Sequence, residues 1–507
     1  MNTKIKTLEE LQRITADLKA TGKKVVHSHG VFDLLHIGHI KHFEEAKSFG
    51  DVLVVTITPD EFVKKGLNRP AFTTSLRLEA LATLETVDYV AANLWPVAVE
   101  TIKMLQPAVY CKGPDYMNHV NDITGKIGDE QKAVESIGGT IKYTDDITYS
   151  SSSLLNKFGN VYSKTQKSFI EKMLMGQDFE KIKIRLDELQ NLKVLVIGET
   201  IIDQYVFCEA LGKSGKEPVL VLRDLGMDQY AGGAAAIARH LSDFCDAVSL
   251  LSMLGEKKEH EDFVLGSMPD NVETHFIFKE NAPTIIKKRY VDHITKSKSL
   301  GVYSLNDTQM KVENQDQFDS YLIDLIPKHD LVIISDYGHG FISSKSAKRI
   351  SKQSIFSSLN AQINAANIGY HTMNNYRDMD CAIINETELR HELRDRDTSV
   401  ELLMKQLAKS LQSKSLVVTQ GNVGATLYVS ENEEYHHCPA FAAKVVDKIG
   451  AGDAMLALIS CSLRSGFEPD LSLFIGSLAA AQSVETIGNS TPVNKLQLLK
   501  TFSHAIK

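Results

Sequence analysis

Two histidines separated by two residues are the first candidates for chemistry in this 507-residue chain. His36 and His39 come after a short apolar run at positions 24–26 and just before residues with a helical period. The spacing therefore predicts that both imidazoles lie where a strand turns into a helix. Unpaired backbone N–H groups and the helix dipole attract phosphate at such a point. A pair of imidazoles beside those donors suits stabilisation of charge on a phosphoryl group.

The residues around the two histidines make this interpretation more specific. Gly30 and Gly38 let the backbone approach a ligand closely, and Phe32 and Asp33 complete the pattern GxFDxxHxGH. An isolated HxxH would indicate only the start of a helix. With the preceding strand, Gly30 and Phe32 in place, we predict a nucleotide-binding loop whose histidines are catalytic.

Short apolar runs alternate with helical patterns around this motif. The expected strands are 24–26, 52–57, 89–91, 109–111 and 140–143. Such alternation predicts a parallel sheet that binds its ligand at the carboxyl ends of the strands. Lys112 follows one of these strands and is a candidate phosphate contact. The hydroxyls of Ser150, Ser151 and Ser152 begin the last helix of the region, where they can cap N–H groups and bind phosphate.

This set of motifs resembles the nucleotidylyltransferases that make CDP- or ADP-activated alcohols and sugars. The resemblance spans residues 23 to 158 and continues through further segments: 50–55, 68–70, Arg77, 87–90, 112–116 and 150–153. It implies a Rossmann-like domain in which a substrate phosphate attacks the α-phosphorus of ATP or CTP. His36, His39 and Lys112 would stabilise the developing charge, and the serines would bind phosphate. The residues leave the choice between ATP and CTP open.

A second chemical motif lies near the end of the chain. Gly450, Ala451 and Gly452 can expose consecutive N–H groups at the start of a helix that we expect over 454–463. Asp453 stands beside them, where a carboxylate can accept the proton of an attacking hydroxyl. A single GxGD is a weak signal, because glycine-rich turns are common at helix starts. The motif gains weight from its company in a second α/β region, which opens with the apolar run 193–198.

Together with Gly232, Gly233 and an Asn385-x-x-Glu388 pattern, this motif resembles the ribokinase-like (PfkB) sugar kinases over residues 193 to 505. The family fold is an α/β sandwich with a β lid. The resemblance implies that Asp453 is the catalytic base and that residues 450–452 form the anion hole. It also implies Mg²⁺ and ATP, with Asn385 and Glu388 organising the metal indirectly.

The same resemblance assigns the remaining contacts of the kinase-like region. Asp203, Gly232, Gly233 and Arg289 would contact the acceptor, and Thr419 and Gly421 would lie near ATP. Relatives that phosphorylate heptose phosphates carry an Asp-Pro-Lys after a strand, where this chain reads 359–364 without the lysine. The bifunctional heptose enzymes also carry the kinase first, so we expect a reversed domain order here. The identity of the acceptor stays open.

Composition limits the possible partners. The net charge is −8, and 43% apolar with 24% charged residues is ordinary for a globular protein, which argues against nucleic-acid or membrane-surface binding. No apolar run reaches membrane-spanning length, and the six cysteines are scattered without a CxxC, which favours a cytoplasmic protein. The expected domains are an N-terminal helix (1–22), a transferase-type domain (23–158), a helical linker (159–192) and a kinase-type domain (193–507).

The resulting hypothesis is a bifunctional enzyme that phosphorylates a sugar or sugar phosphate and makes an NDP-sugar. The family resemblance alone implies a place in cell-envelope glycoconjugate synthesis. Homodimers or higher oligomers are common in both families. The alternative is an active transferase joined to a silent kinase-like scaffold. A tRNA synthetase is disfavoured, because the Lys-Ser segment 295–299 that imitates its second motif falls inside the kinase-like region.

Overall fold

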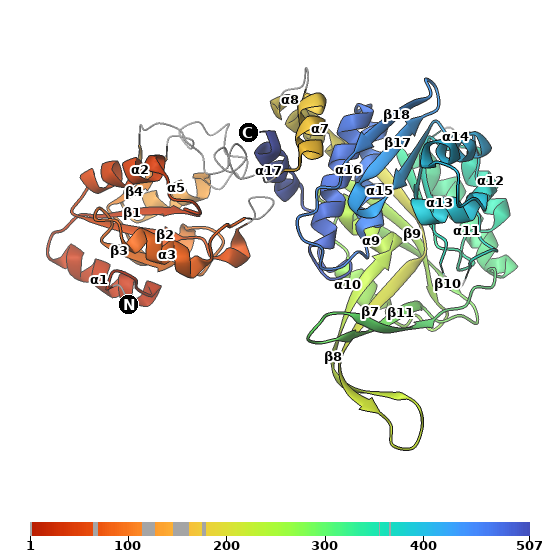
Figure 1. The fold of residues 1–507 in the computed structure, drawn as a ribbon, viewed down its shortest axis with the longest axis horizontal. Coiled ribbons are helices and arrows are strands. Elements are labelled where there is room, and N and C mark those ends of the chain that lie inside the picture. Colours follow the sequence, from red (N-terminus) through yellow and green to blue (C-terminus); the bar gives the residue numbers. More distant parts are fainter. Residues whose placement is uncertain are drawn as a thin grey trace. The chain divides into compact units, whose positions relative to one another are not determined.

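A computed structural model describes residues 3–63, 69–113, 127–144, 162–174, 179–353, 355–364 and 367–506. The chain divides into two compact units, Met1–Ser163 together with Leu499–Lys507, and Lys164–Leu498 (Figure 1). Among the described helices, none combines the length and the apolar character that crossing a membrane requires. All six cysteines are free thiols and are buried.

The first unit is built on a five-stranded parallel sheet in the order β3-β2-β1-β4-β5. Its strands are β1 (Val25–Gly30), β2 (Val52–Ile57), β3 (Tyr89–Ala92), β4 (Val109–Lys112) and β5 (Thr140–Tyr143). All five coincide with predicted strands. The prediction for β1 was too short, since the strand continues to Gly30. Its polar residues stay in a buried strand because they find partners: His27 and His29 both reach the hydroxyl of Thr56 on β2, at 2.8 Å.

Helices cover this sheet. They are α1 (Leu8–Ala20), α2 (Ile37–Ser48), α3 (Thr74–Ala82), α4 (Val99–Leu105) and α5 (Ile127–Ser136), with a 3₁₀ turn η1 (Asp60–Phe62). Helix α1 begins with a capping box, in which the Thr7 hydroxyl and the Glu10 carboxylate each accept the other residue's N–H. Its buried Leu8 and Leu11 pack with Val54 and other sheet residues, so the helix closes one face of the sheet.

The second unit contains a nine-stranded sheet in the order β10-β9-β6-β13-β14-β15-β16-β17-β18, parallel except at β17 and β18. The strands are β6 (Lys193–Gly198), β9 (Ala247–Gly255), β10 (Val272–Lys279), β13 (Leu331–Asp336), β14 (Phe356–Ala361), β15 (Cys381–Asn385), β16 (Ser415–Thr419), β17 (Ala425–Val429) and β18 (Glu434–Cys438). The apolar run predicted at 193–198 is strand β6 of this sheet.

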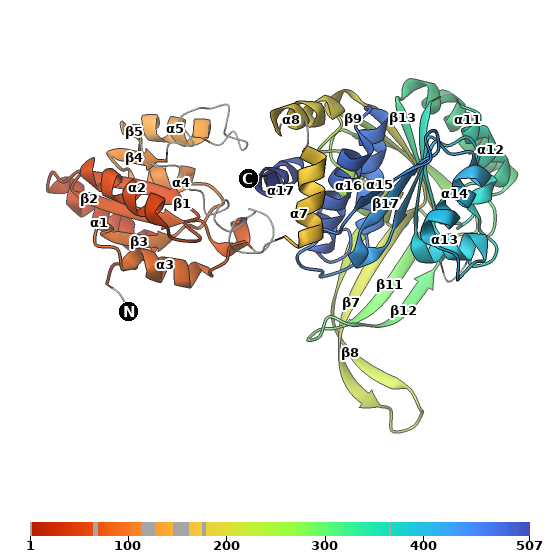
Figure 2. The ribbon, with the colours of Figure 1, turned by 45° about the horizontal axis from the view of Figure 1, so that its top comes forward.

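Helices cover both faces of the large sheet (Figure 2). One face carries α11 (Val312–Leu325), α12 (Ser344–Ser351), α13 (Glu386–Leu393) and α14 (Val400–Leu411). The other carries α9 (Ala234–Leu241), α15 (Ala451–Arg464) and α16 (Pro469–Val484). The remaining elements are α10 (Glu261–Ser267), α17 (Lys495–Ile506), η4 (Leu189–Asn191), η5 (Ile326–Lys328), η6 (Met373–Asn375) and η7 (Gly421–Val423).

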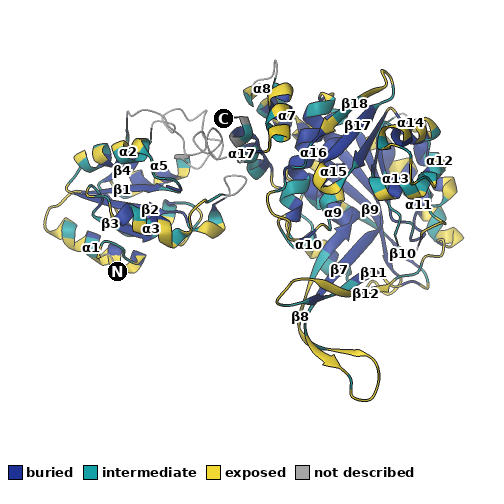
Figure 3. Cartoon of the chain, in the orientation of Figure 1, coloured by how far each residue is buried: buried dark blue, intermediate teal, exposed yellow. Residues whose placement is uncertain are grey.

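A second, four-stranded sheet has the order β12-β11-β7-β8. Its strands are β7 (Thr200–Lys213), β8 (Leu220–Gly233), β11 (Ile285–Asp292) and β12 (Lys298–Ser304). The β7–β8 hairpin extends away from the body of the unit, and its outer part is exposed (Figure 3). Its inner ends are buried, so the residues near the start of β7 and the end of β8 are held beside the large sheet.

The segment expected as a linker forms two helices that belong to the second unit. They are α7 (Lys164–Leu174) and α8 (Phe179–Glu188). The ring of Phe169 on α7 lies 5.9 Å from that of Phe474 on α16, and Arg185 on α8 donates to Glu468 at 2.8 Å. These helices are therefore packed on the kinase-like region.

A substitution at Gly198 can test how closely β6 packs against β13. A Cβ at this position would lie 2.1 Å from the carbonyl oxygen of Ser335, a backbone atom that cannot move aside. We expect Gly198→Ala to lower the free energy of unfolding by roughly 1–3 kcal/mol, the usual cost of overpacking. Urea unfolding followed by circular dichroism measures it. Gly266→Ala, in α10 with open space around it, is the matched control; equal unfolding midpoints for the two variants would contradict the packing argument.

Candidate active sites

The loop after β1 is shaped by close contacts between its own residues. Phe32 adopts a left-handed backbone conformation (φ 47°), and its ring fills the space in which a Cβ on Gly30 would sit, 2.9 Å away. Any larger residue at position 30 would therefore have to displace the Phe32 ring. The Phe32 ring also meets the ring of His39 edge-on at 5.4 Å and that of Phe43 at 5.0 Å, which fixes the first turn of α2.

The structure brings the two motif histidines together at the start of α2. His36 is the N-cap residue, and its ring stacks on that of His39 with the centroids 3.9 Å apart. Both ring nitrogens of His36 are shielded from solvent and have no hydrogen-bond partner among the described residues. Burial lowers the pKa of His36 below its ordinary value. A neutral, unpaired imidazole beside helix N–H groups is suited to meet a ligand oxygen.

Two buried charged residues anchor the loops around these histidines. Asp33 accepts hydrogen bonds from the guanidinium of Arg69 and from the N–H of Ala71, both at 2.9 Å. Arg77 is 1% exposed and donates to the carbonyl oxygen of Val31 at 2.6 Å and to that of Thr58 at 2.9 Å. Because both ion-pairing groups also bind backbone, they hold the loop after β1 against the connection between β2 and α3.

Lys112 ends β4 at the same edge, and it is not a free cation. Its ammonium pairs with the carboxylate of Glu130 on α5 at 2.9 Å, and both side chains are nearly buried. It also lies 3.5 Å from the carbonyl oxygen of His29. The hydroxyl of Tyr110 donates to the same Glu130 carboxylate at 3.1 Å. Sequence reasoning missed Glu130, because α5 carries no motif and meets Lys112 only through the fold.

The predicted serines Ser150, Ser151 and Ser152 lie outside the described residues.

The described part of the site also contains a polar network that the motifs did not reveal. His29 contacts the hydroxyls of Thr56 and Thr58 at 2.8 and 3.2 Å. Burial lowers the pKa of His27 to about 3 and that of His29 well below its ordinary value, so both rings are neutral parts of the strand.

The glycine motif of the second unit opens α15, as the sequence predicted, but the helix begins earlier than expected. It starts at Ala451 rather than Ala454, because Gly450 supplies a left-handed N-cap (φ 92°). A Cβ on Gly450 would meet the amide oxygen of Asn489 at 2.0 Å. Gly452 and Asp453 therefore both lie in the first turn, where the N–H groups are unpaired within the helix.

Asp453 is held by two side chains that sequence reasoning missed. The hydroxyl of Tyr337, just after β13, donates to one carboxylate oxygen at 2.9 Å, and the amide of Asn489 lies 3.4 Å from the other. Burial raises the pKa of Asp453 to about 6, and the negative charge of Asp203 adds to the effect. A carboxylate with this pKa can both take and release a proton near neutral pH.

The predicted acceptor residues gather where the second sheet meets this helix. Asp203 on β7 pairs with Arg289 on β11 at 2.5 Å, and both side chains are largely buried. Gly232, opposite Ile201 in the β7–β8 ladder, leaves room for the Asp203 carboxylate, which a Cβ would touch at 2.2 Å. Gly233 follows with a positive φ of 62°. Asp203 lies close enough to Asp453 for its negative charge to contribute to the raised pKa of that carboxyl.

Asn385 and Glu388 form a capping box at the start of α13. The Asn385 amide oxygen accepts the N–H of Glu388 at 2.8 Å, and the Glu388 carboxylate accepts that of Asn385 at 3.2 Å. Burial raises the pKa of Glu388 to about 7. Thr419 ends the neighbouring strand opposite Asn385, and Gly421 (φ 59°) opens η7 beside it.

This donor set fits Mg²⁺ in the way that phosphate-bound magnesium is usually held. Within the described ranges, no group of three or more His, Cys, Asp or Glu side chains could form a metal cage. Mg²⁺ commonly keeps several waters and binds one carboxylate together with ligand phosphates. Glu388, a buried carboxylate in the first turn of α13, and the amide oxygen of Asn385 at the end of β15 are appropriate for that arrangement.

The Lys-Ser segment lies inside the second unit, as predicted. Lys298 begins β12, and its ammonium pairs with Asp447 at 2.5 Å. The other oxygen of Asp447 accepts the hydroxyl of Tyr205 on β7 at 2.7 Å and the N–H of Gly488 at 3.2 Å. This carboxylate therefore ties two strands of the second sheet to the loop that precedes α15.

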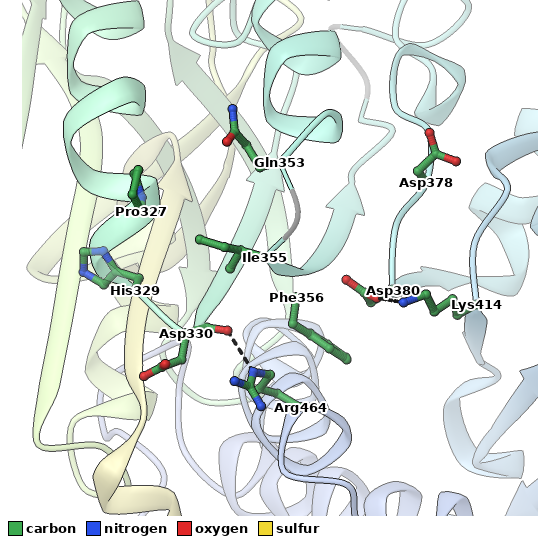
Figure 4. A pocket seen from close by; sticks show the side chains of 10 residues that line it. All are labelled: Pro327, His329, Asp330, Gln353, Ile355, Phe356, Asp378, Asp380, Lys414 and Arg464. Atoms are coloured by element: carbon green, nitrogen blue, oxygen red, sulfur yellow. Dashed lines mark hydrogen bonds and ion pairs between the residues drawn. The ribbon is translucent and has the colours of Figure 1, made fainter.

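A separate pocket of about 680 Å³ opens at the amino ends of strands in the large sheet (Figure 4). It is lined by residues that precede or begin β13 to β16, among them Asp330, Phe356, Asp380 and Lys414. Its charged groups are already used: Lys414 pairs with Asp380 at 2.7 Å, and Arg464 donates to the Asp330 carbonyl at 2.9 Å. None of the predicted site residues lines it.

The Lys112–Glu130 pair generates a stability prediction. Glu130→Gln leaves the buried ammonium uncompensated, so we expect a loss of roughly 3–5 kcal/mol from the free energy of unfolding of the first unit. Urea unfolding of the full chain measures it. Glu135→Gln, an exposed change on the same helix, should stay within about 0.5 kcal/mol of the unmodified chain. Equal effects of the two changes would show that the pair is not a stabilising contact.

Comparison with known proteins finds two family matches in this chain. A cytidylyltransferase-like model matches residues 28–157, and the model of the pfkB family carbohydrate kinases matches residues 191–496. The bifunctional protein HldE of Aliarcobacter butzleri is 43% identical over 141 residues, which are 27% of this chain and 29% of that relative. HldE of Haemophilus influenzae (strain PittEE) is 25% identical over 306 residues, 60% of this chain and 62% of the relative.

The chain thus spans from about three tenths to less than two thirds of the length of these two relatives. We expected a domain order reversed relative to the bifunctional heptose enzymes, and the comparisons do not bear this out. In this chain the cytidylyltransferase-like match comes first and the kinase match second.

A solved structure shares the fold of the second unit. Phosphofructokinase-2 from Escherichia coli superposes with a TM-score of 0.51 and 14% identity, covering 62% of this chain and 100% of that one. Together with the family match over residues 191–496, the nine-stranded sheet and its smaller companion have a ribokinase-like architecture. The chain belongs to the pfkB family of carbohydrate kinases and joins that kinase fold to an N-terminal cytidylyltransferase-like domain of Rossmann type.

Proposed function

We propose that the chain is a bifunctional enzyme, which phosphorylates a sugar or sugar phosphate with ATP and transfers a nucleotidyl group from ATP or CTP to a sugar phosphate. The observation that carries the proposal is a repeated arrangement. Each unit presents a helix start with unpaired backbone N–H groups and titratable side chains beside it, His36 and His39 at α2 and Asp453 at α15. The names of the HldE relatives, which call them bifunctional, support two activities in one chain.

In the kinase unit, the acceptor hydroxyl gives its proton to the Asp453 carboxylate as its oxygen attacks the γ-phosphorus of ATP. Tyr337 and Asn489 hold the carboxylate, so the base is oriented before the acceptor arrives. The N–H groups of residues 450–452 face the charge on the transferred group. Asp203 and Arg289 bind the acceptor. Glu388 and Asn385 would hold Mg²⁺, which would supply positive charge to neutralise the phosphates of the nucleotide.

In the transferase unit, a phosphate oxygen of the sugar phosphate attacks the α-phosphorus, and pyrophosphate leaves. His36 and His39 donate hydrogen bonds to the oxygens that gain charge, and the N–H groups of α2 act with them. Lys112 supplies a positive charge at the same sheet edge, oriented by Glu130. Phosphorus chemistry of this kind depends on positioning, which the anchoring of the loops by Asp33 and Arg77 provides.

The first experiment separates the two activities. Purified full-length protein is mixed with Mg²⁺, ATP, CTP and a panel of heptose, hexose and pentitol phosphates with their parent sugars, and ³¹P NMR follows the products. We expect ADP and an NDP-sugar. Asp453→Asn should abolish ADP formation only, and His39→Ala should abolish the NDP-sugar only, each by at least about 100-fold because each removes a group acting at one site.

The outcomes divide the hypotheses. An NDP-sugar with no ADP from any acceptor would favour the alternative, a silent kinase-like scaffold beside an active transferase. Loss of both products in either single variant, with the fold intact by circular dichroism, would contradict two separate sites. The nucleotide consumed with the NDP-sugar decides between ATP and CTP.

The pH dependence of the kinase tests Asp453 as the base. Because its pKa is raised to about 6, the carboxylate is protonated and inactive below that pH. We expect kcat/KM for the acceptor to fall about tenfold per pH unit below pH 6 and to level off above it. Tyr337→Phe removes a hydrogen bond that stabilises the carboxylate, so the falling limb should move to higher pH. A limb near pH 4, or one that Tyr337→Phe leaves in place, would contradict this assignment.

A further inference from the structure

Lys287 is a buried cation that neither motif predicted. It lies on β11 between Asp203 of β7 and Tyr303 of β12, its direct neighbours in the two strand pairings. The residue is 8% exposed. Its ammonium lies 5.5 Å from the ring centroid of Tyr337 and 5.8 Å from that of Tyr303. Tyr337 is the residue that holds Asp453, so Lys287 lies near the proposed acceptor site around Asp453.

The cations near Lys287 differ from it in being paired. Arg289 pairs with Asp203, Lys298 with Asp447, and Lys279 donates to two backbone carbonyls, of Asn306 and His339. For the Lys287 ammonium, no hydrogen bond or ion pair exists with any residue that the structure describes. An ammonium carries three donors, and leaving them unpaired in a buried site is costly.

The carboxylates within electrostatic reach of Lys287 have other partners. Asp203 is bound by Arg289, and Asp453 by Tyr337 and Asn489. Glu199, at the end of β6, accepts the N–H groups of Tyr337 and His339, both at 2.9 Å. Burial lowers the pKa of Lys287 from its ordinary value, while these three acids act in the opposite direction. The pocket thus attracts the charge of Lys287 without satisfying its donors.

We propose that Lys287 binds a phosphate oxygen of the ligand beside Asp453. This inference rests on the proposed kinase function and deepens it. Sugar hydroxyls can be bound by the carboxylates of the pocket, whereas a buried ammonium is best satisfied by an anionic acceptor. The oxygen comes either from the phosphoryl group being transferred or from a phosphate already present on the acceptor.

Proton transfer strengthens the requirement for an anion here. When Asp453 takes the proton of the acceptor hydroxyl, its charge is lost, and Lys287 keeps its own. The acceptor oxygen then forms the new bond to phosphorus while the bond from the γ-phosphorus to the bridging oxygen breaks, and ADP leaves. The negative charge of the phosphoryl group replaces that of Asp453 near Lys287.

Lys287→Met tests the proposal, with Lys288→Met, the next residue of the strand, as matched control. Inorganic phosphate is titrated calorimetrically into the full-length protein. In Lys287→Met, one class of phosphate-binding sites should weaken, with its Kd raised at least tenfold. Lys288→Met and His39→Ala should keep that class. Without ligand, Lys287→Met should also unfold at higher urea concentration than the unmodified chain, because it removes an unpaired buried charge. A purely structural lysine would give the opposite shift.

Kinetics distinguish the two sources of the phosphate oxygen. If it belongs to the transferred group, Lys287→Met lowers kcat about 100-fold with every acceptor and leaves KM unchanged, and Lys287→Arg restores part of the rate. If it belongs to the acceptor, KM rises at least tenfold for phosphorylated acceptors only. Phosphate binding and kinetics equal to those of Lys288→Met would overturn the proposal. Should the unmodified chain form no ADP, the kinase proposal fails, and the phosphate titration still decides on Lys287.

Discussion

The candidate chemistry of both units depends on one constraint, that the first turn of a helix leaves its backbone N–H groups without partners inside the helix. At α2 the buried parallel strand β1 leads into such a turn, whereas α15 follows a loop after the edge strand β18. The N-cap is His36 at α2 and Gly450 at α15. Neither makes a side-chain cap, so the donors stay available to an anion. The different neighbours, imidazoles at one turn and a carboxylate at the other, suit charge stabilisation and base catalysis respectively.

Burial shifts the pKa values of these neighbouring side chains, and the surrounding ion pairs offset the cost of burying charge. It raises the pKa of Asp453 to about 6 and lowers that of His36, in each case favouring the neutral form. Nearby charges are compensated locally: Lys112 by Glu130, and Asp203 by Arg289. Breaking such a pair leaves a buried charge without a partner, which costs more than the pair contributes when intact. Positioning and stability therefore depend on the same contacts.

The sequence predicts what is local and misses what the fold brings together. Apolar runs located all five strands of the first sheet, but the end of β1 was missed because its histidines are satisfied only by Thr56 on a neighbouring strand. The glycine motif predicted the turn before α15 but not the residue at which the helix begins. Glu130, Tyr337 and Asn489 carry no motif, and each meets its partner from a distant element. The roles of the predicted site residues remain proposals that mutation can decide.

The residues of the proposed kinase site come from parts of the fold that belong to two different sheets. Asp203, Lys287 and Arg289 come from the smaller sheet, whereas Asp453 lies on a helix that covers the larger one. Asp447 joins the two parts, since its carboxylate binds Lys298 and Tyr205 of the smaller sheet beside the loop that leads to α15. Under the proposed roles, changes along β7 and β11 would alter which acceptor is bound and leave the base and its helix intact. Acceptor choice would then be separable from phosphoryl transfer, and the contacts of Asp447 would hold the two parts in register.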